Sequence, residues 1–366
     1  MNKLARSAVS RRDFLGVAVG AAITSSGIVR AQERGETLAA AAARKGMRFG
    51  MMLTPRDLDS PQAVAIVVAQ SNLTGPCNAL KWPQTNPSGP KADYALAERF
   101  AAFASEHRMA LRGHTILWDK APNLPRWVLA ENWKRAGQWA AALEARARDL
   151  VTHFRGRVTL WDVINEAVRP NTGAPVGGPF YKALGRDFID IAFHAAHESD
   201  PSARLMYNDY VVPGKPRHQE GILELISGMQ QRGVPIDALG IQGHLWSNPT
   251  DADLHQWAGF LGEVRQLGLE INLTELDVID NGLPGDPEDR DRLAGMRMRR
   301  FLDATLADPA LRNIYTWSVT DKFEGVSRLN PRKDRLKRRP TLFDANFSPK
   351  PIFTAIRDAL EAAPRR

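Results

Sequence analysis

Short apolar runs alternate with longer amphipathic segments along most of the chain, and this alternation is its clearest pattern. The runs are hydrophobic at nearly every position, which is typical of strands that are buried on both faces. We expect eight strands, at residues 48–53, 71–74, 110–116, 159–165, 204–209, 238–244, 270–276 and 313–319.

Helical periodicity fills the intervals between these runs. Ser60 and Pro61 form a start signal, with proline at the first helical position. Asp251 is expected to cap a helix that closes at Gly268. Further helices are expected at residues 92–107 and 139–154.

The repeated strand–helix order predicts an α/β fold, a single (β/α)8 TIM barrel. The alternative is an open doubly wound sheet. That fold usually has a glycine-rich phosphate turn after an early strand, and the sequence has none there. The chain has 366 residues, of which 43% are hydrophobic, so it is long enough to bury a barrel-sized core.

Residues 1–31 have the features of an export signal. Arg11 and Arg12 precede an apolar run at residues 17–29, and a small-residue cleavage site ends at Ala31. The alternative is a membrane helix, but the run is shorter than the roughly 20 residues that a membrane span needs. We therefore predict a twin-arginine signal and a periplasmic or secreted mature protein, with no membrane contact, formed by residues 32–366.

The cysteine content excludes an internal disulfide, because Cys77 is the only cysteine. The charge of the chain bears on its possible binding partners. The net charge is +8, and much of the excess lies in residues 328–340, which are either a solvated basic loop or a docking site for an acidic polymer. Export and the lack of a binding motif argue against nucleic acid. We find no metal-ligand spacing and no cofactor motif.

Two glutamates stand at the ends of predicted strands. Glu166 follows the fourth strand, and Glu275 lies at the end of the seventh. The strands of a barrel end on one face, and these two strands are expected on opposite sides of the ring. Facing carboxyl groups are the requirement of glycoside hydrolysis, and a separation of about 5–5.5 Å predicts retention of configuration. The alternative is that both glutamates are structural and pair with lysine or arginine.

Several motifs in the same order resemble the xylanases of glycoside hydrolase family 10, over nearly all of the mature chain. The resemblance implies the (β/α)8 fold, endo-1,4-β-xylanase activity and a glycoside hydrolase domain at residues 32–366. The matching segments are RGHTILW (112–118), WDVINE (161–166), NDY (208–210), IQGH (241–244), TELD (274–277) and LFDANFSPKP (342–351).

The resemblance also implies residue roles. Glu166 would be the acid/base and Glu275 the nucleophile. Asn165 would bind the sugar 2-hydroxyl, and His244 would contact Glu275 and be held by Asp277. The sugar site would be lined by Asn78, Lys81, His114, Trp118, Gln242 and Trp317. The implied enzyme is a retaining hydrolase that cleaves internal β-1,4 bonds of xylan or a related hemicellulose, acid-decorated forms included. We expect it to act as a monomer without metal or cofactor.

Three positions depart from the family pattern. Cys77 replaces a glutamate that grips the sugar one place beyond the cleavage site, and Asp119 replaces a histidine. A second tryptophan is missing near Gly325. These changes predict an altered specificity. They also leave alternatives open: a glycosidase or transglycosylase for another β-glycan, a non-catalytic carbohydrate-binding barrel, or an exported anion-binding protein.

Overall fold

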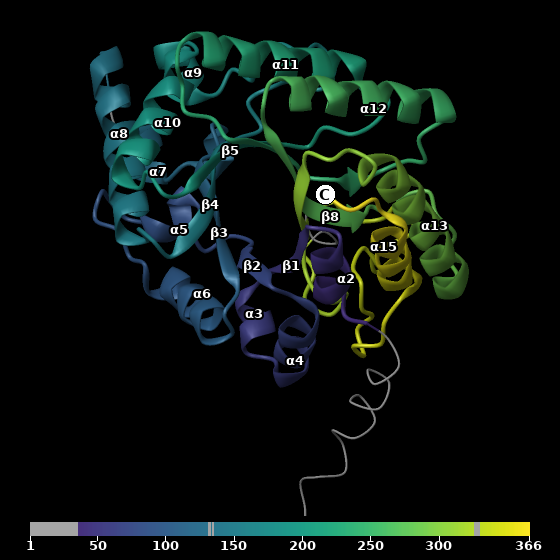
Figure 1. The fold of residues 1–366 in the computed structure, drawn as a ribbon. Helices are drawn as coiled ribbons and strands as arrows, with labels where there is room; N and C mark the ends of the chain where they lie inside the picture. The colour runs from purple at the N-terminus through teal and green to yellow at the C-terminus, as the bar shows by residue number, and fades with distance from the viewer. Residues whose placement is uncertain (1–35, 131–132, 134, 326–329) are drawn as a thin grey trace, which may run out of the picture. The chain divides into compact units, whose positions relative to one another are not determined.

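Parallel strands close into a ring that is surrounded by helices (Figure 1). The computed structural model describes residues 36–366, except 131–132, 134 and 326–329, and the fold occupies residues 37–366. The predicted export signal therefore lies outside the described residues. None of the described helices is both long and apolar enough to cross a bilayer.

The strands follow chain order around the ring, and β6 closes it by pairing with both β5 and β8. The described residues thus form the predicted single (β/α)8 barrel, which is confirmed. The strands are β1 (Arg48–Leu53), β2 (Leu73–Pro76), β3 (Ala110–Leu117), β4 (Val158–Asn165), β5 (Arg204–Asp209), β6 (Ala238–Ile241), β7 (His244–Leu245), β8 (Glu270–Val278) and β9 (Leu311–Thr316).

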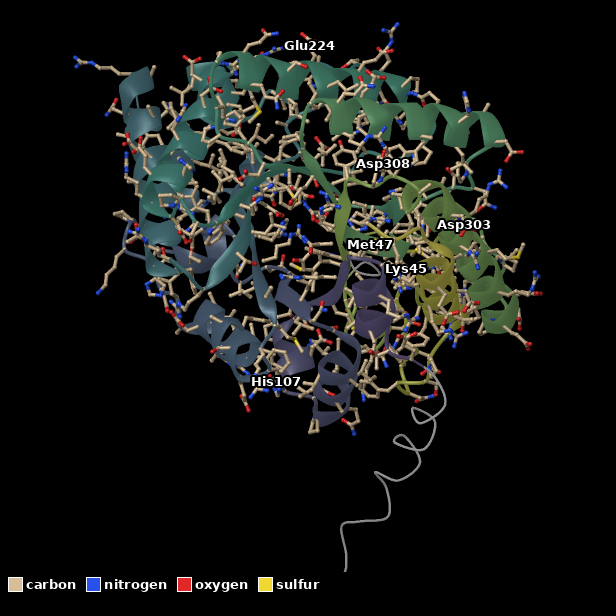
Figure 2. The ribbon with its side chains drawn as sticks, viewed as in Figure 1. Lys45, Met47, His107, Glu224, Asp303 and Asp308 are labelled. Carbon is tan, nitrogen blue, oxygen red and sulfur yellow. The ribbon has the colours of Figure 1, made fainter. Side chains whose placement is uncertain are left out.

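Helices form the outer layer, and their exposed faces are polar. Figure 2 shows Glu224 on α11 and Asp303 on α13 pointing away from the barrel. The helices are α2 (Leu38–Arg44), α3 (Pro55–Leu58), α4 (Pro61–Gln70), α5 (Trp82–Thr85), α6 (Ala95–Glu106), α7 (Arg126–Ala130), α8 (Ala136–His153), α9 (Pro179–Leu184), α10 (Asp187–Ser199), α11 (Pro216–Gln231), α12 (Asp251–Gln266), α13 (Pro287–Thr305) and α15 (Pro351–Ala362).

Of the two predicted helix starts, the structure confirms one and corrects the other. Ser60 caps α4 and accepts a hydrogen bond from the backbone of Ala63. The predicted cap Asp251 is wrong by one residue, because Thr250 caps α12 and forms a capping box with Asp253. Asp251 instead occupies the first turn, where its negative charge suits the helix dipole.

The predicted strand 238–244 is interrupted. β6 ends at Ile241, and Gly243 adopts a left-handed conformation with φ of +75°. A Cβ atom at this position would also lie 2.5 Å from Leu276. The chain therefore turns at Gly243, and His244 resumes pairing in β7 opposite Asp277 of β8.

Successive side chains along a strand point to opposite faces of the sheet, so some pack under the outer helices and their neighbours point into the barrel. Trp161 on β4 is fully buried and packs on Gly113 of β3, where a Cβ atom would lie only 2.2 Å from the indole. This contact explains the glycine of the RGHT segment. The neighbouring positions Arg112, His114 and Asp162 meet one another as a buried polar group.

The basic segment at residues 328–340 is partly folded inward, so it is not solvated along its whole length. Arg332 and Arg338 are almost fully buried and pair with Asp280, at 3.5 Å and 3.0 Å. Arg339 pairs with Asp291 at 2.5 Å. These three arginines fasten the loop to the barrel, so they are not available to an acidic polymer. Lys333, Arg335 and Lys337 remain exposed, and Arg328 lies outside the described residues.

Candidate active site

Glu166 follows directly after β4 and is almost buried. Its backbone has a φ of +56°, which is uncommon for a residue with a side chain. Gln242 donates a hydrogen bond to Oε1 at 3.0 Å, and the Trp118 indole donates to Oε2 at 3.2 Å. The Lys120 ammonium also contacts Oε2. Three donors therefore converge on this carboxylate.

Glu275 lies within β8, which continues to Val278, so it does not end its strand as predicted. Asn208 donates a hydrogen bond to Oε1 at 2.9 Å, and His244 Nε2 lies 3.3 Å from Oε2. The other imidazole nitrogen of His244 lies 2.8 Å from Asp277 Oδ1. The predicted arrangement of His244 between the glutamate and Asp277 is therefore present.

The surroundings of Glu275 favour its ionised form. Burial by itself raises the pKa of this carboxyl group, but the hydrogen bond from His244 and the positive charges nearby hold the pKa well below its usual range. Burial opposes the charge on His244, yet Asp277 and Glu275 raise the pKa of that imidazole well above its ordinary value. Asp277 and Glu275 thus both favour the protonated form of His244, and His244 in turn favours the ionised form of Glu275.

The two glutamates have the spacing around the ring that their places on the fourth and seventh predicted strands imply. The order β4–β5–β6–β8 puts three steps between their strands in an eight-strand ring, one step short of diametric opposition. The amide side chains of Asn208, Asn165 and Gln242 lie between the two glutamates. Asn208 bonds both Glu275 and Asn165 at 2.9 Å, and Gln242 lies 3.4 Å from the same Asn165 oxygen. A continuous set of hydrogen bonds therefore joins both carboxylates.

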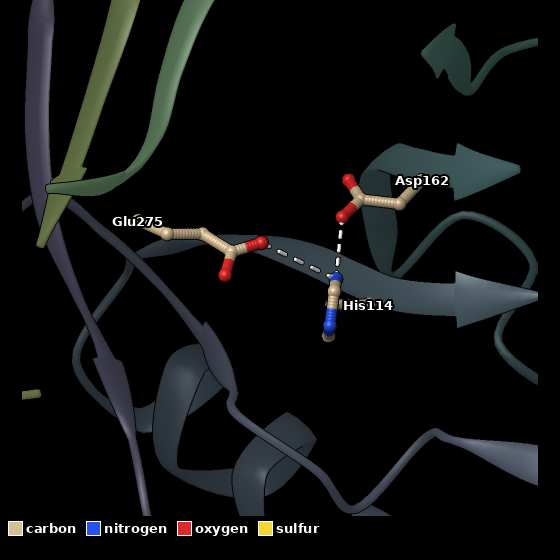
Figure 3. A group of neighbouring side chains, drawn as sticks. All are labelled: His114, Asp162 and Glu275. Atoms are coloured by element: carbon tan, nitrogen blue, oxygen red, sulfur yellow. Dashed lines mark hydrogen bonds and ion pairs between the residues drawn. The ribbon is translucent and has the colours of Figure 1, made fainter. Parts of the chain in front are cut away.

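A buried charged cluster supports Glu275 from inside the barrel (Figure 3). His114 Nδ1 lies 2.6 Å from Asp162 and 3.9 Å from Glu275. Arg112 forms two hydrogen bonds with Asp162 and lies 3.6 Å from Glu275. His114, Asp162 and Glu275 have the spacing of metal ligands. The Arg112 guanidinium already balances the two carboxylates, and His114 uses Nδ1 to bind Asp162, so hydrogen bonding accounts for this cluster.

Several predicted sugar-binding residues gather beside this cluster. Lys81 Nζ lies 4.7 Å from the Trp118 ring centroid and 5.7 Å from that of Trp317. Trp317 also packs edge-on against His114. Burial lowers the pKa of Lys81, partly offset by Glu275. Asn78 is different, because it is exposed, and within the part of the chain that the structure describes no hydrogen bond joins it to either glutamate.

Two of the three departures from the family pattern, Cys77 and Asp119, have structural explanations. Cys77 is buried in an apolar group with Met52, Leu73 and Tyr315, so it forms a wall and offers no charge to a sugar. Burial also raises the pKa of its thiol far above the ordinary value. Asp119 accepts hydrogen bonds at 2.9 Å from the backbone of Phe180 and Tyr181. It therefore anchors the start of α9 to the loop after β3.

Four residues of the site had no role in the sequence prediction. Three of them, Arg112, Asp162 and Asn208, lie inside the matching motifs. Each is a charged or amide residue within an apolar strand, and this feature could have marked them as site residues. Lys120 had no such sign, because a lysine in a loop after a strand is ordinarily solvated. Its contact with Glu166 depends on how the loop folds back over the barrel mouth.

The sequence of this chain is similar to those of known glycoside hydrolases. The model of glycosyl hydrolase family 10 matches residues 37–359. Endo-1,4-beta-xylanase B of Thermotoga neapolitana is 31% identical over 305 residues, which cover 83% of this chain and 84% of that protein. Endo-1,4-beta-xylanase 5 of Pyricularia oryzae is 33% identical over 305 residues, covering 81% and 72%.

Solved structures of xylanases are also similar to this chain over most of its length. Xylanase 10B from Thermotoga petrophila RKU-1, in complex with xylobiose, has a TM-score of 0.81 and 28% identity, covering 90% of this chain and 98% of its own. Native xylanase 10B from Thermotoga maritima has a TM-score of 0.78 and 28% identity, covering 89% and 98%. The match across the barrel and the paired glutamates at its mouth establish that this chain belongs to glycosyl hydrolase family 10.

Proposed function

We propose that the protein is a retaining glycoside hydrolase that cleaves internal β-1,4 bonds of xylan or a related hemicellulose by double displacement. The observation that carries this proposal is the difference between the two glutamates. Glu275 is fixed by His244, Asn208 and Arg112 and is held ionised. Glu166 follows β4 directly, among donors that include the partly exposed Lys120 side chain.

These surroundings suit two different tasks. In the first step, Glu275 attacks the anomeric carbon while Glu166 gives a proton to the departing glycosidic oxygen. In the second step, Glu166 removes a proton from a water molecule, and that water displaces Glu275 from the sugar. In this proposal Asn165 binds the neighbouring 2-hydroxyl, and its hydrogen bonds with Asn208 and Gln242 support this role.

The indole and imidazole rings near Glu275 suit a sugar. Trp118 and Trp317 offer apolar faces on either side of Lys81, and His114 adds a polar edge. The names of the relatives point to xylan, and the neighbour from Thermotoga petrophila holds xylobiose. Arg112, His244 and Asp277 argue against a binding protein, because a binder has no need of a supported nucleophile.

The test is incubation with a panel of β-glycans, including linear xylan, mixed-linkage glucan and mannan. We expect xylan to be shortened from internal positions, and the first products to have the β-anomeric form when they are followed by proton NMR. Products of the α form, or activity confined to another β-glycan, would contradict the proposal.

We also propose that residues 1–31 direct export by the twin-arginine route. The support is the paired Arg11 and Arg12 before a short apolar run. Replacing both with lysine should leave the precursor in the cytoplasm, and cell fractionation measures this. Normal export of the double-lysine variant would contradict the assignment.

A further inference from the structure

Glu166 leaves β4 in a backbone conformation that needs support. Its φ of +56° lies in the left-handed region, which is unfavourable for a residue with a side chain and persists only where the surroundings fix it. Its amide donates a hydrogen bond to the backbone oxygen of Asn208 on β5, at 2.9 Å. The next amide, that of Ala167, donates to the Tyr207 hydroxyl at 3.0 Å. Two consecutive amides therefore tie this turn to β5.

Tyr207 reaches the turn from behind the barrel wall. Side chains alternate along β5, so Asn208 points to the glutamates while Tyr207 and Asp209 point to the opposite face. Tyr207 and Asp209 are completely buried, and His218 of α11, in the outer layer, lies 3.2 Å from Asp209. The Tyr207 hydroxyl is thus out of reach of a sugar in the barrel mouth. Any effect of it on catalysis must pass through the backbone that carries Glu166.

The hydrogen bonds of Tyr207 run in one direction. A backbone amide only donates, so the hydroxyl oxygen accepts from Ala167, and the hydroxyl proton is left for Asp209 Oδ2, which it contacts. Asp209 Oδ1 accepts from the amide of Tyr210 at 2.8 Å. Burial and the adjacent Asp209 raise the pKa of Tyr207 well above its ordinary value, so the hydroxyl keeps its proton. Asp209 therefore orients the hydroxyl, and the hydroxyl holds the amide that follows Glu166.

We propose that Tyr207, oriented by Asp209, is a positioning residue for the acid/base: it fixes the turn that places the Glu166 carboxylate at the glycosidic oxygen. This rests on the proposed function, in which Glu166 gives and removes the proton. Without the hydroxyl, the Ala167 amide would lose its acceptor and the turn one of its two ties to β5. The carboxylate would then shift, and a misplacement of about 1 Å can lower a rate by about 10²-fold.

The nucleophile is supported separately. Glu275 is contacted by His244, Asn208 and Arg112. Within the described part of the chain, no hydrogen bond or ion pair joins Glu275 to the Tyr207 hydroxyl or to Asp209. Loss of the hydroxyl should therefore disturb proton transfer by Glu166 and spare the attack by Glu275. This selectivity distinguishes a positioning role from a general contribution to the fold.

The test is Tyr207→Phe, which removes a single oxygen atom. The variant and the wild type are compared on a xylo-oligosaccharide and on an aryl xyloside with a good leaving group. We expect kcat/KM on the oligosaccharide to fall by roughly tenfold to a hundredfold, because its leaving group needs a well-placed proton donor. Pre-steady-state release of the aryl alcohol should be nearly unchanged, because that leaving group needs no proton.

Two further variants complete the design. Tyr94→Phe is the matched control, because Tyr94 donates a hydrogen bond of the same kind to Asp149, at 2.7 Å, beside the start of α6. It should behave as the wild type on both substrates. Asp209→Asn puts an amide in place of the carboxylate that orients the Tyr207 hydroxyl, and it should reproduce the selective loss. Thermal unfolding establishes which variants are folded, and Asp209→Asn decides if Tyr207→Phe does not fold.

The outcomes separate the two proposals. If the wild type does not cleave the oligosaccharide, or if Glu166→Ala slows both substrates equally, the proposed function fails. If Glu166→Ala is selective but the folded Tyr207→Phe and Asp209→Asn variants keep wild-type rates, or slow both substrates by the same factor, this inference is overturned. A selective loss in Tyr94→Phe overturns it as well, because the effect would then not depend on contact with the Glu166 turn.

Discussion

Arg112 donates two hydrogen bonds to the Asp162 carboxylate inside the barrel, of 2.9 Å and 2.5 Å. Both side chains are completely buried, and Arg112 also donates to the backbone oxygen of Thr274, next to Glu275. This pair joins β3 and β4 to β8 beneath the reacting groups. The position of Glu275 therefore depends on residues that need not touch the substrate.

Removing Arg112 should weaken the fold. Arg112→Met leaves the buried Asp162 with His114 in place of a permanent positive charge, and breaking a buried ion pair by removing one partner destabilises proteins by about 3–5 kcal/mol. Urea unfolding followed by circular dichroism measures the loss. Arg148→Met is the control, because it breaks only exposed pairs with Glu144 and Glu198 and should leave the midpoint nearly unchanged. Equal midpoints for the two variants would contradict the structural role of Arg112.

Removing the Glu275 carboxylate should abolish turnover while sparing the fold. Glu275→Ala is expected to lower kcat by about 10⁴-fold or more, the scale found when a nucleophile is deleted. Glu270→Ala, at the other end of β8, should retain activity because that residue pairs with Arg204 away from the barrel mouth. Reducing-sugar release from xylan is the measurement. Substantial residual activity in Glu275→Ala would refute its role.

Removing Glu166 should affect substrates according to their leaving groups. General acid catalysis contributes about 10²–10⁴-fold, and only poor leaving groups need it. Glu166→Ala should therefore slow the first step on xylo-oligosaccharides far more than on activated aryl xylosides. Pre-steady-state release of the aryl alcohol isolates that step. Equal losses on both substrates would show that the acid lies elsewhere.

Removing His244 should shift the acid limb of the pH profile. The hydrogen bond from His244 helps to lower the pKa of Glu275, so His244→Ala should raise it. The nucleophile is active only when ionised. Activity of the variant should therefore disappear at a higher pH than in the wild type as the solution is acidified. The pH dependence of kcat/KM measures this, and an unmoved acid limb would show that His244 does not tune Glu275.

The fold was largely predictable, because each strand is a short apolar run and each interval has a helical period. The exceptions are local. β6 stops at Ile241 because Gly243 takes a left-handed turn, and the hydrophobic pattern carries no sign of that turn. The cap of α12 was misplaced because Thr250 and Asp251 are both good capping residues, and the choice between them depends on the backbone.

The site was predictable where sequence motifs supply it and less so where it depends on tertiary packing. Glu166 and His244 lie as expected, whereas Glu275 lies inside β8 and not at its end. The catalytic roles of these residues remain predictions for the experiments above. The two strands stand three steps apart in the ring, as the order of the predicted strands implies. The contact of Lys120 with Glu166 was invisible, because it joins a loop to a strand end that lies 46 residues farther along the chain.

Asp119 ties together two segments that surround the barrel mouth, because its carboxylate, after β3, holds the first backbone amides of α9, after β4. Gly178 makes room for this attachment, since a Cβ atom there would lie 1.9 Å from the Asp119 backbone oxygen. Grafting either segment alone from a homologue would separate the aspartate from its glycine. A chimeric enzyme with altered substrate range should therefore exchange both segments together.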